Sequence, residues 1–129
     1  MVEAVVDQKL EPVVVGPITR HMLALYCGAS GDHNPIHVDS DFAKAAGMVD
    51  VFAHGMLSMA FLGRMLTNWV PQQSIREFEV RFTAIVHIGD VITSNGAVVS
   101  IEDGLAELEI AATNQKDEVV IKGRASVRL

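Results

Sequence analysis

The sequence predicts an α+β domain in which an antiparallel sheet curls around one buried helix. The segment 55–69, "GMLSMAFLGRMLTNW", is apolar on almost every side, which is typical of a helix that is buried over most of its surface. After Pro71, apolar and polar side chains alternate, which is the period of half-buried strands. A helical middle followed by a run of strands favours α+β over an alternating α/β arrangement.

Composition and charge fit one globular domain covering residues 1–129. Half of the 129 residues are hydrophobic, which excludes a disordered chain. The formal net charge of −6 argues against a nucleic-acid surface, because phosphate binding needs clustered Lys and Arg. We see no signal peptide and no membrane-spanning run, and the single cysteine, Cys27, suits a reducing compartment. A cytoplasmic protein is therefore expected.

The first half of the chain is expected to form an early strand and two short helices. Residues 1–16 are rich in valine and favour an extended segment that ends in a strand. Thr19 is a suitable N-cap for a helix that ends near Gly31, where glycine can adopt the left-handed conformation. Pro35 prevents this helix from continuing, and "SDFAKAAGM" then predicts a short helical turn.

The second half is expected to form the buried helix and an antiparallel meander. In "REFEVRFTAIV", Phe78, Val80 and Phe82 alternate with charged side chains, which indicates a half-buried strand. The sequence "EDG" is typical of a hairpin turn. Further strands are expected over residues 91–101, 105–113 and 119–129.

The polar segment "GDHNPIH", residues 31–37, is the first candidate for chemistry. His33 and His37 are spaced as in some zinc-binding helices, but that spacing brings the two rings together only on a helix, which Pro35 forbids. We therefore expect no metal site. A thiol nucleophile is also disfavoured, because Cys27 falls within a predicted helix and a lone thiol is usually a small buried hydrophobe.

The remaining interpretations of this segment are a plain turn and an acid–base pair. Asp and Asn favour helix-terminating turns, so a turn alone would account for Asp32 and Asn34. However, Asp32 and His37 flank a rigid X-Pro turn that holds two side chains in fixed relation. Gly55 opens the buried helix shortly afterwards and can offer a free N–H to a carbonyl oxygen. Such a combination suits thioester chemistry at Cα and Cβ.

At these residues the sequence closely resembles a known family. The stretch "YCGASGDHNPIHVDSDFA", followed by "FAHGMLSMAFLGRML", is similar to the MaoC-like hydratase/dehydratase family, the (R)-specific enoyl-thioester hydratases. The resemblance covers about residues 16–129 and is sharpest over 26–63. It implies a single hot-dog fold, a curved antiparallel sheet wrapped around a long central helix.

The resemblance also implies a hydro-lyase activity without a cofactor. Water would add in the syn sense to a trans-2-enoyl thioester of coenzyme A or acyl carrier protein, or a (R)-3-hydroxyacyl thioester would be dehydrated. Asp32 and His37 would be the catalytic pair that activates the water. Asn34 would orient the pair or the water, and the N–H of Gly55 would hydrogen-bond the thioester oxygen.

Other residues and functions remain open at this point. Ser58 is a candidate for the substrate pocket or a satisfied interior serine, and His54 is expected to pack or cap. Pocket depth is expected to depend on Met56, Met59 and Leu62. The alternative functions are an acyl-CoA thioesterase and a thioester-binding subunit that works only with a partner chain. We expect a homodimer, or a heterodimer with another hot-dog chain, and no nucleic-acid or membrane partner.

Overall fold

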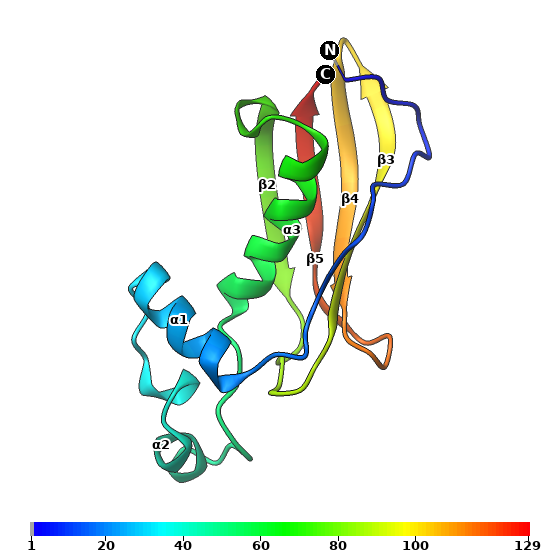
Figure 1. The fold of residues 1–129 in the computed structure, drawn as a ribbon. Helices are drawn as coiled ribbons and strands as arrows, with labels where there is room; N and C mark the ends of the chain where they lie inside the picture. Colours follow the sequence, from blue (N-terminus) through cyan, green and yellow to red (C-terminus); the bar gives the residue numbers. More distant parts are fainter. Residues whose placement is uncertain (1) are drawn as a thin grey trace.

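The computed structural model, which describes residues 2–129, is a single five-stranded sheet with one long helix along its face and two shorter helices beyond one end (Figure 1). All neighbouring strands are antiparallel and follow the order β1-β3-β4-β5-β2. The strands are β1 (Val13–Val15), β2 (Ile75–Phe82), β3 (Ile92–Glu102), β4 (Leu105–Thr113) and β5 (Val119–Arg128). This architecture confirms the expected hot-dog fold.

The helical segments lie between β1 and β2 in the chain. They are α1 (Arg20–Ser30), the 3-10 turn η1 (Pro35–His37), α2 (Ser40–Ala45), α3 (Gly55–Trp69) and the 3-10 turn η2 (Gln72–Ser74). As predicted, the hydroxyl of Thr19 accepts a hydrogen bond from the N–H of Met22, and Gly31 ends α1 in the left-handed conformation with φ 77°. Within residues 2–129, no helix combines the length and apolarity needed to cross a membrane.

The central helix α3 lies along the sheet and contacts β1, β2, β3 and β4 (Figure 1). Its buried face is formed by Leu57, Ser58, Leu62, Met65 and Leu66. The expectation of burial on most sides is wrong for the isolated chain, because Met56 is 55% exposed and Ala60 is also exposed. The sheet covers one side of α3, and no other part of residues 2–129 covers Met56 and Ala60.

The meander is fixed by tight turns and one close strand contact. Asp103 and Gly104 adopt positive φ values of 49° and 73° between β3 and β4, the conformation of a two-residue hairpin turn. Farther along, a Cβ on Gly123 of β5 would lie 1.9 Å from the carbonyl oxygen of Glu79 on β2. Glycine at this position therefore allows the two backbones to approach.

A separate region, which we call the site lobe, comprises residues 19–54 and lies at one end of α3 (Figure 1). Arg20 at the start of α1 forms an ion pair with Asp50, and Ser40 of α2 donates a hydrogen bond of 2.9 Å to the same carboxylate. These bonds hold the pKa of Asp50 well below its usual range, chiefly through the Arg20 guanidinium. Polar contacts thus connect α1, α2 and the segment that leads into α3.

Candidate active site

The loop after α1 is shaped by its own polar side chains. The hydroxyl of Ser30 accepts from the N–H of Asp32 at 3.1 Å, and the Asp32 carboxylate accepts from the N–H of Asn34 at 3.2 Å. The side-chain oxygen of Asn34 in turn accepts from the N–H of Ile36 at 3.1 Å and caps η1. These are the side-chain-to-backbone bonds that make Asp and Asn common in turns. These bonds confirm the turn interpretation for Asp32 and Asn34.

The same hydrogen bonds bear on the two polar candidates in the loop. The carboxylate of Asp32 uses Oδ1 for the turn and is exposed, so Oδ2 is left for a water or a ligand. The oxygen of Asn34 is occupied by η1, which leaves its NH₂ group for any orienting role. The structure thus gives Asn34 a part in building the loop.

His37 is held in a defined tautomer at the end of η1. Its Nδ1 lies 2.7 Å from the backbone carbonyl oxygen of Phe52, and because a carbonyl only accepts, Nδ1 carries the proton. The carbonyl is fixed in turn, since Phe52 bridges to His87 and the N–H of Ala53 donates to the carbonyl of Val86 at 2.9 Å. In the neutral ring Nε2 is therefore a free acceptor.

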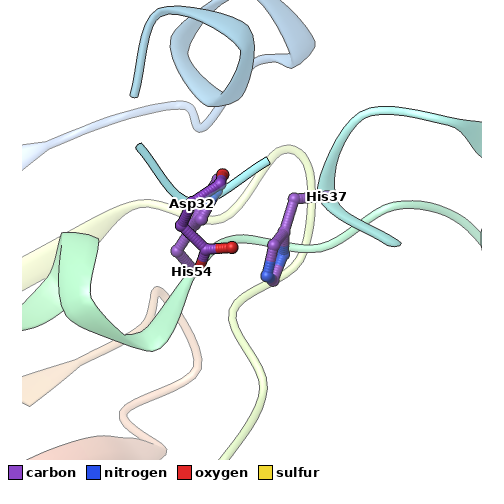
Figure 2. Close-up of side chains that lie close together, drawn as sticks. All are labelled: Asp32, His37 and His54. Atoms are coloured by element: carbon purple, nitrogen blue, oxygen red, sulfur yellow. The ribbon is translucent and has the colours of Figure 1, made fainter. Parts of the chain in front are cut away.

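Asp32 and His37 come together with a third residue, His54 (Figure 2). A carboxylate oxygen of Asp32 and one ring nitrogen from each histidine lie within 4.8 Å of one another. A water about 2.8 Å from two such atoms can bridge them. The pair chosen from the sequence is therefore close enough to share one water.

The sequence predicted that His54 packs or caps, but not that it contacts His37. Its ring stacks on that of His37, with centroids 3.8 Å apart and planes 24° from parallel, which confirms that it packs. His54 occupies the N-cap position of α3 but makes no side-chain capping bond. The one signal in the sequence was its position directly before Gly55.

The three side chains also raise the question of a metal site. His33, whose spacing from His37 had raised that question in the sequence, is exposed and not part of the cluster. A metal needs one lone pair from each ring aimed at a common point. His37 Nδ1 and His54 Nε2 both approach backbone carbonyls, so the lone pairs are on His37 Nε2 and His54 Nδ1. Because the rings are stacked, these in-plane lone pairs are directed side by side rather than across a shared site.

Gly55 begins α3 beside an apolar cavity of about 180 Å³. As the first helical residue it has no acceptor for its N–H within the helix, and none of the backbone bonds of residues 2–129 uses it. A Cβ at this position would lie 2.9 Å from the ring of Phe82, so glycine allows that ring to pack over the helix start. The cavity is lined by Phe52, Ala53, Gly55, Ser58, Phe82, Ala84, Ile85, Val86 and Val120.

Ser58 lines this cavity, as the first of its two interpretations expects. The side chain is 3% exposed, and its hydroxyl has no hydrogen-bond partner among residues 2–129. Met56, Met59 and Leu62, on which pocket depth is expected to depend, do not line this cavity. The cavity opens toward the segment after β2, whereas the helix face that carries Leu62 packs into the core.

The fold and the site together define a class of protein, a hot-dog domain with a carboxylate–imidazole pair at the start of its central helix. The family follows from the sequence. The family model described as "MaoC like domain" matches residues 2–120, so this chain belongs to the MaoC-like family.

Similar proteins agree with this assignment. The (R)-specific enoyl-CoA hydratase of Rhodospirillum rubrum is 31% identical over 113 residues, which are 85% of this chain and 78% of that protein. The fatty acid synthase subunit beta of Saccharomyces cerevisiae is 29% identical over 105 residues, 79% of this chain but only 5% of that much longer protein. Among solved structures, the R-hydratase PhaJ1 of Pseudomonas aeruginosa superposes with a TM-score of 0.86 at 27% identity, covering 98% of this chain and 82% of that one.

Proposed function

We propose that this chain is an (R)-specific enoyl-thioester hydratase, which also catalyses the reverse dehydration of (R)-3-hydroxyacyl thioesters. The observation that carries the proposal is the Asp32–His37 pair, whose carboxylate oxygen and ring nitrogen are within 4.8 Å of each other beside the open start of α3. The R. rubrum relative is named for this activity.

In the proposed mechanism, one water is bound between Asp32 and Nε2 of His37. Because Nδ1 of His37 donates to Phe52, Nε2 can accept a proton from this water while its oxygen bonds to C3 of the enoyl group. The carboxylate of Asp32 accepts the water's other hydrogen bond and orients its lone pair. The proton held on Nε2 is then returned to C2 on the same face, so that one water adds across the double bond in the syn sense.

The thioester is bound by the first turn of α3. Its carbonyl oxygen accepts a hydrogen bond from the N–H of Gly55, and this bond strengthens as enolate character develops during addition. Such a donor is worth about 3 kcal/mol in comparable sites. The acyl chain enters the apolar cavity beside Gly55, where the unpaired hydroxyl of Ser58 is the one buried polar side-chain atom offered to the substrate or a water.

The test is to mix the purified chain with a short trans-2-enoyl-CoA and to follow the loss of enoyl absorbance, with chiral analysis of the product. Formation of the (R)-3-hydroxyacyl-CoA is the expected result. Release of free coenzyme A would instead identify a thioesterase. The (S) product would contradict the stereochemical assignment.

A partner-dependent subunit is the second candidate, and it is favoured by exposed apolar side chains beside the cavity. Met56 and Phe82 are 55% and 50% exposed, and Ile85 is exposed as well. We propose that a second hot-dog chain, in a homodimer or heterodimer, covers them. Light scattering of the purified chain distinguishes a dimer from a monomer, and a monomer without turnover would favour the heterodimer.

Two further features belong to this proposal. Residues 1–129 act as a single domain, and the substrate is carried on coenzyme A or acyl carrier protein in the cytoplasm. The buried free thiol of Cys27 suits that compartment.

A further inference from the structure

The buried side chain of His54 touches both members of the acid–base pair. It is 2% exposed and contacts both the loop that carries Asp32 and the ring of His37. Its Nε2 is 3.2 Å from the backbone carbonyl oxygen of Asp32, and its ring stacks on His37 at 3.8 Å. On the other side, the ring meets Tyr26 edge to face at 4.7 Å, and Cys27 Sγ lies 3.4 Å from the same Nε2.

These contacts fix the protonation state of the ring. Because the carbonyl of Asp32 can only accept, Nε2 of His54 carries the proton and Nδ1 has the lone pair. Nδ1 is buried and has no hydrogen-bond partner among residues 2–129, so a second proton there would find no acceptor in the described part of the chain. Burial accordingly lowers the pKa of His54, and His37 lowers it further, whereas the carbonyl and carboxylate of Asp32 act in the opposite direction.

We propose that His54 is a positioning residue that holds both catalytic side chains in their working geometry. This inference rests on the proposed hydratase function and adds a residue to it. The stacking contact, together with the bond from His37 to Phe52, fixes the plane of the His37 ring and thus the direction of its Nε2 lone pair. The bond to the Asp32 carbonyl fixes the loop on which the carboxylate stands.

The two contacts can be removed one at a time. His54→Phe keeps an aromatic ring against His37 but removes the N–H donor to Asp32. His54→Gln keeps an N–H donor but removes the ring. Because a misplacement of about 1 Å costs about 100-fold in rate, we expect each variant to lose roughly that much in kcat. KM for a short trans-2-enoyl-CoA should change by less than about threefold, since the donor of Gly55 and the cavity are left in place.

Leu108→Ala on β4 is the matched control for lost stability. Leu108 is buried in the core and does not line the cavity, so its truncation lowers the free energy of unfolding and should leave kcat per folded molecule unchanged. Wild-type kcat in either His54 variant would overturn the proposal. So would an equal loss of kcat in Leu108→Ala, because the effect would then follow stability alone.

A measurement without substrate keeps this inference separate from the hydratase assignment. Nitrogen NMR of the imidazole rings in the wild-type protein should show His54 neutral with its proton on Nε2, and His37 with its proton on Nδ1. A proton on Nδ1 of His54 would overturn the proposed geometry even if the enzyme is active. A wild-type chain that shows the expected tautomers but no turnover would contradict the proposed function and leave the geometry standing.

Discussion

The sheet and the site lobe differ in the share of polar contacts that they contain. In the sheet, side chains such as Val98, Leu108 and Ile121 are fully buried in one continuous apolar core. The site lobe contributes Leu23 and Val51 to the same core, and it adds the Arg20–Asp50 ion pair and the turn bonds around Asp32. The proposed catalytic side chain of Asp32 thus stands on a short polar turn, and that of His37 at the end of η1.

This difference implies that substitutions in the two regions should affect different properties, stability in the sheet and turnover in the site lobe. Changes in the sheet should reduce stability and leave the chemistry of each folded molecule intact, because the hydrogen-bond and ring partners of Asp32 and His37 within residues 2–129 lie in the site lobe. Changes to the exposed turn residues of the site lobe, such as Asp32, should reduce turnover with little loss of stability, because these side chains bury little apolar area.

The largest effect is expected for Asp32→Asn in the site lobe. The amide oxygen can still accept from the N–H of Asn34 and preserve the turn, but the NH₂ group that replaces Oδ2 cannot accept the hydrogen bond that orients the water. We therefore expect kcat/KM to fall about 1,000-fold while the midpoint of urea unfolding stays near that of the wild type. Asp39→Asn, which alters the cap of α2 instead, is the matched control and should keep its rate. Near-wild-type turnover of Asp32→Asn would remove Asp32 from the mechanism.

The largest loss of stability is expected for Gly123→Ala in the sheet. The added Cβ would overlap the carbonyl oxygen of Glu79 and separate β2 from β5, at a cost of about 3 kcal/mol in the free energy of unfolding. Gly28→Ala on α1 is the control, because a Cβ there meets nothing within 4 Å. In a helix this change should stabilise the protein by about 0.5 to 1 kcal/mol. Equal urea midpoints for the two variants would refute the close strand contact.

A smaller effect is expected where the two regions meet, at Phe82. Its ring lies over Gly55 and lines the cavity, so Phe82→Ala should enlarge the space for the acyl chain. One methylene in an apolar pocket changes kcat/KM by at least about tenfold. The ratio of kcat/KM for longer trans-2-enoyl-CoA esters to kcat/KM for short ones should therefore rise about tenfold. The ratio of kcat/KM values over a series of chain lengths measures this.

Phe42→Ala provides the comparison for that experiment, since Phe42 is similarly exposed on α2 but does not line the cavity. Its chain-length profile should match the wild type. An unchanged profile in Phe82→Ala as well would mean that the acyl chain lies elsewhere.

The two regions also differ in how far the sequence predicts them. Strand periodicity located all four strands of the meander, because alternation directly records which side of a sheet is buried. The bounds of α3 were likewise clear, since Gly55 and Pro71 mark its ends. Exposure of Met56 was not predicted, because a helix pattern does not reveal how much cover the rest of the chain provides.

In the site lobe, the sequence indicated residues but not their contacts. Asp32 and His37 were identified from a short motif and a family resemblance. Phe52, whose carbonyl binds His37, is 15 residues away from it in the sequence. His54, which binds the carbonyl of Asp32, is 22 residues away from Asp32. These contacts form only after folding. The cavity likewise joins α3 to the segment after β2, and no local pattern records that contact.

The smallest effect, and the last that separates the two regions, is the pH dependence of stability due to His54. Since burial lowers its pKa in the native state, the unfolded state binds more protons below about pH 6.5, the ordinary value for histidine. The free energy of unfolding should therefore decrease as the pH falls below that value, and His54→Phe should make this dependence shallower. Leu108→Ala carries no titrating group and should lower stability by the same amount at each pH. Urea unfolding above and below about pH 6.5 measures both differences. If the free energy of unfolding depended on pH with the same slope in wild type and His54→Phe, His54 would have the same pKa in the folded and unfolded states. Any loss of stability in acid would then come from another group.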